Sequence, residues 1–276
     1  MPELPEVQTI VDALKKSIIG KKIKSVDIDC SRVFSQSKVS FKKGLKGKKI
    51  KNIKRRGKFL IIDLTENQTL LIHLGMTGGI FFSNKNQSHK KHDHLIIKFS
   101  DKTQIRYHDP RKFGKVIKVT SSNINKIPEI TKLGPEPLEI SQSEFVDIFE
   151  NKKGRIKTTL LNQRVLAGLG NIYSDEALFD AKIHPLTKTD RLKEKKLLQL
   201  HSSIQKILKN AIKAGGSSID DYLNIDGEMG LFQFQHKVYG REGEPCKVCG
   251  AKIKRIRISQ RSSFYCPRCQ KLSTPP

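Results

Sequence analysis

Met1-Pro2-Glu3-Leu4-Pro5-Glu6-Val7 opens the chain and begins its first predicted helix. Initiator methionine is ordinarily removed before proline, and its removal here would leave Pro2 with a terminal secondary amine. Such an amine is the type of nucleophile that condenses with an aldehyde carbon to give an iminium ion. Glu3 and Glu6 place two carboxyl groups near it, able to transfer protons at a reacting centre. The alternative is purely structural: a helix start with Pro5 in the first turn and an acidic residue favoured by the helix dipole.

Beyond this stretch the sequence changes from a helical to a strand pattern. Apolar residues recur at helical spacing up to Ile18, and Gly20 can end the helix. Short segments rich in β-branched and aromatic residues follow, separated by turn residues such as Glu66-Asn67-Gln68. They predict an antiparallel β-sandwich. Residues 1–125 are therefore expected to form one β-rich domain fronted by a helix.

The central part of the chain, residues 126–225, has a helical pattern. A long helix is predicted over residues 192–214, ended by Gly215. Before it, Gly168-Leu169-Gly170 leads into another helix with Asn171 at its cap. A glycine turn at a helix N-terminus can hold a phosphate group, although most such turns are only tight loops.

The C-terminal region carries the most specific local pattern. Two Cys-x-x-Cys pairs lie there with many lysines and arginines between them: Cys246, Cys249, Cys266 and Cys269. This spacing is typical of a four-cysteine zinc site. So short a module rarely stabilises itself without a metal, so we expect one structural Zn²⁺ in a β-hairpin finger over residues 236–276. An iron–sulfur cluster is the less favoured alternative because the surroundings are so basic. Zinc with four sulfur ligands has no open position, so it is expected to have no catalytic role.

The net charge of the chain narrows the class of binding partner. Lys plus Arg outnumber Asp plus Glu by 53 to 27, which gives a formal net charge of +26. This excess indicates a polyanion, with nucleic acid favoured over an anionic membrane, while a generally lysine-rich proteome is the plainer explanation. No apolar run reaches the ~18 residues of a membrane span, and the acidic start is unlike a secretory signal. We expect a soluble, cytoplasmic protein without a membrane partner.

With these residues in view, the chain resembles the formamidopyrimidine-DNA glycosylase family, also called 8-oxoguanine DNA glycosylase/AP lyase. The resemblance covers nearly the whole length and rests on an ordered set of motifs. These are Pro2–Val7, Arg56–Lys58, His73–Gly78, Lys91–His94, Asp109–Gly114, Leu133–Pro137, Gly170–Tyr173, Val238–Arg241 and the four-cysteine tail with Gln260-Arg261. It implies an α+β multidomain fold: a helix-fronted antiparallel β-sandwich, a central helix–two-turn–helix domain and a C-terminal zinc-finger β-hairpin.

The resemblance also implies base excision repair on damaged double-stranded DNA. Pro2 would attack C1′ of the damaged nucleotide, expelling the base and leaving a Schiff base. Glu3 would be the proton donor for ring opening, with Glu6 supporting the site. Lys58 and Arg261 match the family's proton donors for β- and δ-elimination, so that the strand is cut on both sides of the lost sugar.

Further residues are implied as DNA contacts. Met76, Arg111 and Phe113 resemble a wedge that fills the space of the flipped nucleotide, because a thioether and a phenyl ring can replace base stacking and a guanidinium can donate to a base edge. Lys58, His73, Asn171 and Arg261 resemble the family's phosphate grip around the flipped nucleotide. His92, Lys152 and Lys157 resemble further DNA contacts. Taken singly, each has a plainer interpretation: core packing for the apolar residues, solvated surface charge for the lysines.

Two other functions stay open. An endonuclease VIII-like glycosylase of oxidised pyrimidines is one, although that branch typically begins Pro-Glu-Gly-Pro-Glu and this chain has Leu4. Lesion preference is the least determined property, because Ser217–Tyr222 and Leu231 depart from the family's usual residues near the loop that covers the damaged base. The other is a non-enzymatic zinc-ribbon binder of nucleic acid, which would follow if Met1 is retained. A monomer is expected in each case.

Overall fold

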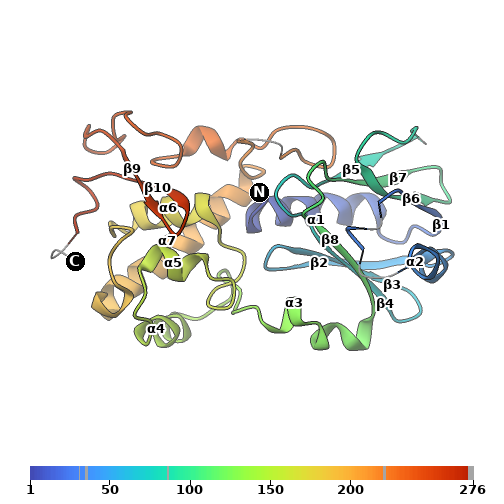
Figure 1. The fold of residues 1–276 in the computed structure, drawn as a ribbon, viewed down its shortest axis with the longest axis horizontal. Coiled ribbons are helices and arrows are strands. Elements are labelled where there is room, and N and C mark those ends of the chain that lie inside the picture. Colours follow the sequence, from blue (N-terminus) through green and yellow to red (C-terminus); the bar gives the residue numbers. More distant parts are fainter. Residues whose placement is uncertain (31, 35–36, 86, 220–221, 273–276) are drawn as a thin grey trace. The chain divides into compact units, whose positions relative to one another are not determined.

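The computed structural model describes residues 1–30, 32–34, 37–85, 87–219 and 222–272. The chain folds into two compact units, which are described separately below (Figure 1). Unit 1 comprises Met1–Thr131 and Ile212–Gln233, and unit 2 comprises Lys132–Ala211 and Phe234–Pro276. The last part of the predicted central domain therefore belongs to unit 1, because Tyr222 and Ile225 are buried in the core of that unit.

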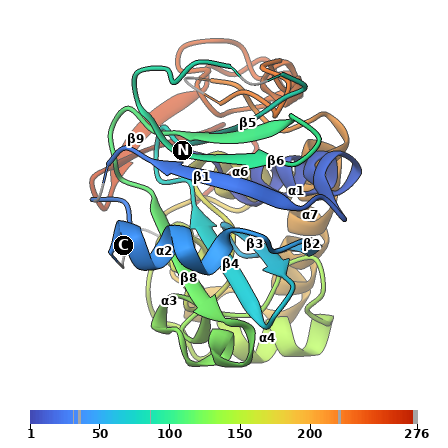
Figure 2. The same ribbon diagram turned by 90° about the vertical axis from the view of Figure 1, so that its right-hand side faces the viewer.

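Unit 1 is a sandwich of two four-stranded antiparallel sheets, as the strand pattern predicts. The strand orders are β1-β6-β7-β5 and β2-β3-β4-β8, and Figure 2 looks onto this unit with one sheet over the other. The strands are β1 Ile23–Ile28, β2 Ile50–Arg56, β3 Phe59–Leu64, β4 Gln68–His73, β5 Gly79–Ser83, β6 Asp93–Phe99, β7 Gln104–His108 and β8 Lys115–Thr120. The helices are α1 Leu4–Ile18, α2 Lys38–Leu45 and α3 Pro128–Thr131, with the 3₁₀ turn η1 Ser121–Lys126.

Helix α1 confirms the predicted N-terminal helix. Its apolar face is fully buried in the sandwich core, and Gly20 follows it with a φ of 80°, a left-handed conformation that favours glycine. The sheets supply the rest of that core through paired residues such as Leu60 with Ile72. Burial of each such side chain contributes about 1.5–3 kcal/mol, so α1 is held firmly at the start of the chain.

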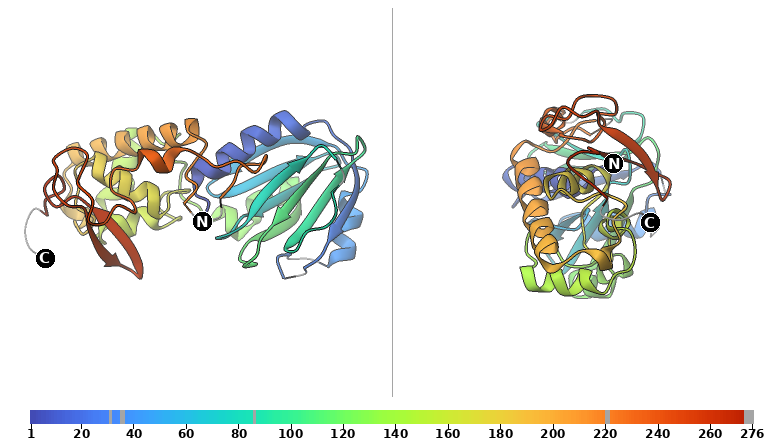
Figure 3. Two further views of the ribbon diagram at one scale, coloured as in Figure 1. Left: turned by 90° about the horizontal axis from the view of Figure 1, so that it is seen from above. Right: turned by 90° about the vertical axis from the view of Figure 1, so that its left-hand side faces the viewer.

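Unit 2 combines helices with the C-terminal hairpin that the four tail cysteines flank, and Figure 3 shows the hairpin beside the helices of this unit. Its elements are α4 Gln142–Glu150, α5 Ile156–Leu161, α6 Asn171–Asp180, η2 Thr189–Arg191, α7 Glu194–Lys213, β9 Lys254–Ile258 and β10 Arg261–Tyr265; α7 and η3 Phe232–Gln235 run across the boundary between the units. Helix α7 confirms the long helix predicted over 192–214. The predicted cap of α6 is wrong by one residue, since Gly170 is the N-cap and Asn171 is the first helical residue. Among the described residues, no helix is both long and apolar enough to cross a membrane.

Candidate active site and nucleic-acid interface

The N-terminal motif is folded into the start of α1. Pro2 is buried, and Glu3 is the N-cap of the helix. The backbone N–H of Glu3 donates to Oε2 of Glu6 at 2.7 Å, and both carboxyl groups are almost fully buried. The helix start thus fixes the backbone of Glu3, the residue next to Pro2, whose nitrogen is in a peptide bond with Met1 in the translated chain.

Glu6 also fixes the loop after α7. Its Oε1 accepts the backbone N–H of Ser217 at 2.8 Å. Gly216, with a φ of 84°, passes so close that a Cβ there would lie 2.8 Å from the same oxygen. Both oxygens of Glu6 are thus used in backbone contacts, one to the N-terminus and one to the 215–218 loop. Glu6 thus ties the start of α1 to this loop. Asp220 and Asp221, further along the loop, lie outside the described residues.

Lys58 and His73 lie at neighbouring ends of paired strands, Lys58 just before β3 and His73 at the end of β4. Burial, together with the positive charges of Lys58 and Lys115, lowers the pKa of His73 to about 4, so its ring is neutral at pH 7. Nδ1 of His73 accepts the backbone N–H of Gly75 at 3.1 Å, which places the ring proton on Nε2. Lys58 and His73 thus offer two hydrogen-bond donors, the ammonium of Lys58 and the neutral Nε2–H of His73.

The three predicted wedge residues are exposed on two loops of unit 1. Met76 lies between β4 and β5, with 43% of its surface accessible, and Phe113 lies between β7 and β8 with 51% accessible. The guanidinium of Arg111 stacks 4.8 Å from the centre of the Phe113 ring. The plainer interpretation of the two apolar residues as core is therefore wrong. Exposed apolar side chains beside a guanidinium are suited to contact base faces.

Two more of the predicted contacts are accessible. His92, in the turn before β6, is half-buried with a φ of 71°, and burial and the charge of Lys91 lower its pKa. Lys152 is exposed just after α4 in unit 2. Their assignment as DNA contacts stays a prediction.

Asn171 joins helix α6 to the hairpin. Its side-chain Nδ2 donates to the carbonyl of Ser262 at 2.9 Å, while its Oδ1 is buried without a hydrogen-bond partner among the described residues. The glycine turn therefore positions an amide against β10, and its assignment as a phosphate contact stays a prediction.

The prediction that Lys157 contacts DNA disagrees with the structure. The side chain of Lys157, on α5, has no exposed surface, and its ammonium pairs with the buried carboxylate of Asp175 on α6. Burial raises the pKa of Asp175, and the nearby ammonium opposes that rise. The burial of Lys157 could not be predicted, because a lysine's buried partner 18 residues away is not visible in a sequence.

Two adjacent acidic residues attach the cysteine-rich module to α6, and the sequence reasoning missed both. Asp175 Oδ2 accepts the backbone N–H of Phe264 in β10 at 3.0 Å. Glu176 accepts the backbone N–H groups of three consecutive residues, Lys237, Val238 and Tyr239, at 2.9–3.0 Å. An acidic pair in the helix that follows a glycine turn, in a chain so rich in cations, was the available signal.

Arg261 begins β10 at the tip of the hairpin. The turn before it consists of Ser259 and Gln260, both with positive φ (46° and 64°), between the paired residues Ile258 and Arg261. Two positive φ values define the tight two-residue turn that suits hairpin twist. Non-glycine residues there are strained, a feature that often accompanies functional sites.

The four tail cysteines form a metal site. Their sulfur atoms all lie within 4.8 Å of one another, with Cys246 to Cys269 at 4.0 Å and Cys249 to Cys266 at 3.4 Å. Tetrahedral Zn²⁺ with ~2.3 Å bonds requires sulfur atoms about 3.8 Å apart, so the set fits. The residues hold one structural zinc ion, and with four thiolates the ion needs no further ligand.

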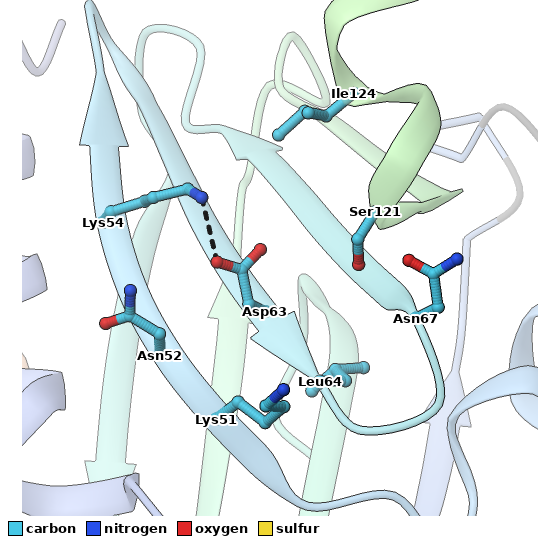
Figure 4. A pocket seen from close by; sticks show the side chains of 8 residues that line it. All are labelled: Lys51, Asn52, Lys54, Asp63, Leu64, Asn67, Ser121 and Ile124. Carbon is cyan, nitrogen blue, oxygen red and sulfur yellow. Dashed lines mark ion pairs between the residues drawn. The ribbon is translucent and has the colours of Figure 1, made fainter.

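A separate groove on unit 1 does not belong to the candidate site. Its volume is about 470 Å³, and its lining residues are Lys51, Asn52, Lys54, Asp63, Leu64, Asn67, Ser121 and Ile124. Figure 4 shows that Lys54 reaches across to Asp63, with which it forms an ion pair at 3.0 Å. One of its two lysines is thus neutralised, and none of its lining residues is a predicted contact.

Comparison with known proteins places the chain in a family. Residues 1–116 match the formamidopyrimidine-DNA glycosylase N-terminal domain, residues 133–222 its H2TH domain and residues 243–272 the zinc finger found in FPG and IleRS. The chain is 40% identical to the formamidopyrimidine-DNA glycosylase of Lactobacillus helveticus over 98% of this chain and 99% of that protein. It is also 40% identical to the Bacillus subtilis protein of that name, again over 98% and 99%.

Solved structures agree with the sequence relatives. A Lactococcus lactis FPG mutant in complex with Fapy-dG containing DNA has a TM-score of 0.92 at 40% identity, covering 98% of this chain and 100% of that one. The L. lactis enzyme with abasic-site DNA has a TM-score of 0.91 with the same coverage. The fold and site therefore define a DNA-repair glycosylase with AP lyase chemistry. The chain belongs to the formamidopyrimidine-DNA glycosylase family.

Proposed function

We propose that the protein excises oxidised purines, 8-oxoguanine and formamidopyrimidines, from duplex DNA and then cuts the strand by β- and δ-elimination. The observation that carries this proposal is the locked N-terminus, where Glu3 and Glu6 hold the start of α1 and the nitrogen of Pro2 becomes a secondary amine once Met1 is removed. The relatives named after the same chemistry support it.

The reaction begins at the Pro2 nitrogen. Its lone pair attacks C1′ of the damaged nucleotide, the C1′–N bond to the base breaks, and the base takes up a proton as it leaves. Glu3 supplies the proton that opens the sugar ring, which gives an iminium between nitrogen and C1′. Loss of a C2′ proton expels the 3′ phosphate, and a second elimination expels the 5′ phosphate. We assign the proton transfers of these two steps to Lys58 and Arg261, and the positioning of the amine to Glu6.

The contacts with DNA divide into a wedge and a phosphate grip. Met76, Arg111 and Phe113 would occupy the space of the extruded nucleotide, because extrusion leaves a gap in the stack that costs a few kcal/mol unless it is filled. The phosphate contacts would come from Lys58, His73, His92, Lys152, Asn171 and Arg261. Lys157 would act indirectly, through Asp175. We further infer that the protein works as a monomer in the cytoplasm, where bacterial chromosomal DNA lies.

Oxidised pyrimidines are a second candidate substrate class. One of the similar structures is the L. lactis enzyme bound to DNA containing an oxidised pyrimidine. Comparing excision rates on duplexes with 8-oxoguanine and with thymine glycol decides between the classes; faster excision of thymine glycol would overturn the purine assignment.

Borohydride trapping tests the proposal itself. Duplex with 8-oxoguanine opposite cytosine is mixed with the processed protein and reduced, and a covalent protein–DNA complex is expected. Pro2→Gly should trap far less, and a form whose N-terminus carries an uncleaved extension should not trap, because its Pro2 nitrogen is an amide. Equal trapping by wild type and Pro2→Gly would contradict the role given to Pro2.

A further inference from the structure

A buried carboxylate joins the two loops that carry Met76, Arg111 and Phe113. Asp109 follows strand β7, is 0% exposed, and begins the β7–β8 loop. Its Oδ1 accepts the hydroxyl of Thr77, in the β4–β5 loop, at 2.7 Å. Its Oδ2 accepts the backbone N–H of Gly114 at 2.9 Å and the hydroxyl of Tyr107 at 3.0 Å. One side chain thus bonds the residue after Met76 and the residue after Phe113.

Thr77 completes the connection between the loops. The oxygen that donates its proton to Asp109 also accepts the backbone N–H of Arg111 at 3.3 Å. The backbone of Asp109 is fixed as well: its N–H donates to the carbonyl of His92 at 3.0 Å, and its carbonyl lies 2.9 Å from Nε2 of His94. Asp109 therefore cannot shift without moving both loops and the start of β6.

The two loops also touch directly, without room for adjustment. A Cβ on Gly75 would lie 2.6 Å from the backbone nitrogen of Gly114. A Cβ on Gly114 would lie 1.8 Å from the hydroxyl oxygen of Tyr107. Burial and the neighbouring Asp109 carboxylate raise the pKa of Tyr107, so its phenol stays protonated and keeps donating to Asp109. The spacing of the loops is therefore set by this one set of contacts.

We propose that Asp109 is a positioning residue for base extrusion, whose carboxylate fixes the loop of Met76 and the loop of Arg111 and Phe113 at one mutual spacing. Its carboxylate contacts neither the reacting sugar nor the base. The inference rests on the proposed function in one respect: the three exposed side chains must act as the wedge. Geometry of this kind matters because misplacement of a group by about 1 Å can cost about 10²-fold in rate.

The test compares a substrate that needs extrusion with one that does not. Single-turnover excision of 8-oxoguanine is measured beside strand cleavage at a preformed abasic site, where no base has to leave the stack. Asp109→Asn and Thr77→Val should each slow 8-oxoguanine excision by about tenfold or more, as expected for losing a hydrogen bond to a charged group, while abasic-site cleavage stays within about twofold. The matched controls are Thr77→Ser, which keeps the hydroxyl, and Asp101→Asn, at the exposed turn before β7; both should behave like wild type.

The results on the two substrates decide whether Asp109 positions the two loops for base extrusion. Equal losses on the two substrates would overturn the proposal in favour of a general structural role, and unchanged excision by both variants would overturn it outright. If Asp109→Asn does not fold, the Thr77→Val and Thr77→Ser pair gives the answer. Met76→Ala tests the premise that the three exposed side chains act as the wedge. If this variant excises 8-oxoguanine as wild type does, the wedge assignment is wrong, and the positioning role given to Asp109 is wrong with it.

Discussion

His73 shows how one residue's surroundings set its chemistry. Its ring is half-buried at the end of β4 near two lysines, and Nδ1 already accepts a backbone N–H. A neutral ring keeps one N–H for an anionic ligand without adding positive charge beside Lys58. A second cation there would favour the unprotonated form of Lys58, whereas the proposed role of that lysine needs a proton to transfer.

The lowered pKa of His73 predicts a pH dependence of stability. The unfolded ring titrates near 6.5 and the folded ring near 4, so below pH 6.5 the unfolded chain binds more protons. This part of the free energy of unfolding is therefore fully present above pH 6.5 and is lost as the pH falls towards 4, by at most about 3 kcal/mol. His73→Gln should flatten the pH profile of chemical denaturation in that window, whereas His89→Gln, at an exposed histidine, should not. Identical slopes for wild type and His73→Gln would contradict the assignment.

At the scale of elements, helix α6 organises unit 2. Three side chains on its first two turns hold the C-terminal region. Asn171 and Asp175 hydrogen-bond to β10, and Glu176 hydrogen-bonds to the segment before Cys246. The hairpin that presents Arg261 is thus attached to α6 at two places, Ser262 and Phe264, and the segment before it at a third. Its orientation depends on one helix rather than on the metal alone.

Asp175→Asn should separate the two elimination steps. The substitution leaves the buried Lys157 ammonium without its charge partner, a loss that typically costs about 3–5 kcal/mol of stability, and loosens β10. We expect the product ratio to shift from δ- to β-elimination with bound zinc unchanged, as resolved on a sequencing gel with an abasic-site duplex. Asp180→Asn, on the same helix but pairing with Lys206 at the surface, is the matched control. An unchanged product ratio would show that Arg261 does not depend on this attachment.

Elements with a strong periodicity of apolar residues were predictable from the sequence, and individual side-chain contacts were not. Helix α1, the sandwich strands and the cysteine finger carry regular spacings of apolar residues or cysteines that indicate their structure directly. Helix α2 was missed because it buries only Phe41 and Leu45, too few apolar positions for a period to show. The burial of Lys157 and the role of Asp109 depend on partners from other elements, which exist only once the chain has folded.

At the scale of the whole molecule, the net charge of +26 predicts steeply salt-dependent binding of DNA. Each neutralised phosphate releases counterions, so the logarithm of the affinity should fall with the logarithm of salt concentration by about 0.9 per contact. Affinities measured by fluorescence anisotropy over a salt series should give a slope of several units. A flat response would contradict a phosphate grip.

Zinc removal should affect one module of the molecule. Cys249→Ser removes a thiolate ligand, and we expect loss of the metal, unfolding of the finger and weaker DNA binding. The sandwich of unit 1 should remain folded, because its core is built without the finger. Zinc content, limited proteolysis and DNA affinity check this, with Cys30→Ser, outside the cluster, as the control. Global unfolding would instead make the finger integral to the fold.

The central claim is that the Pro2 nitrogen bonds to the sugar of the damaged nucleotide. Its most direct test is peptide mapping of the borohydride-reduced protein–DNA conjugate by mass spectrometry. We predict that the deoxyribose remnant lies on Pro2 of a chain that has lost Met1. A remnant on a lysine such as Lys58, with Pro2 unmodified, would contradict it.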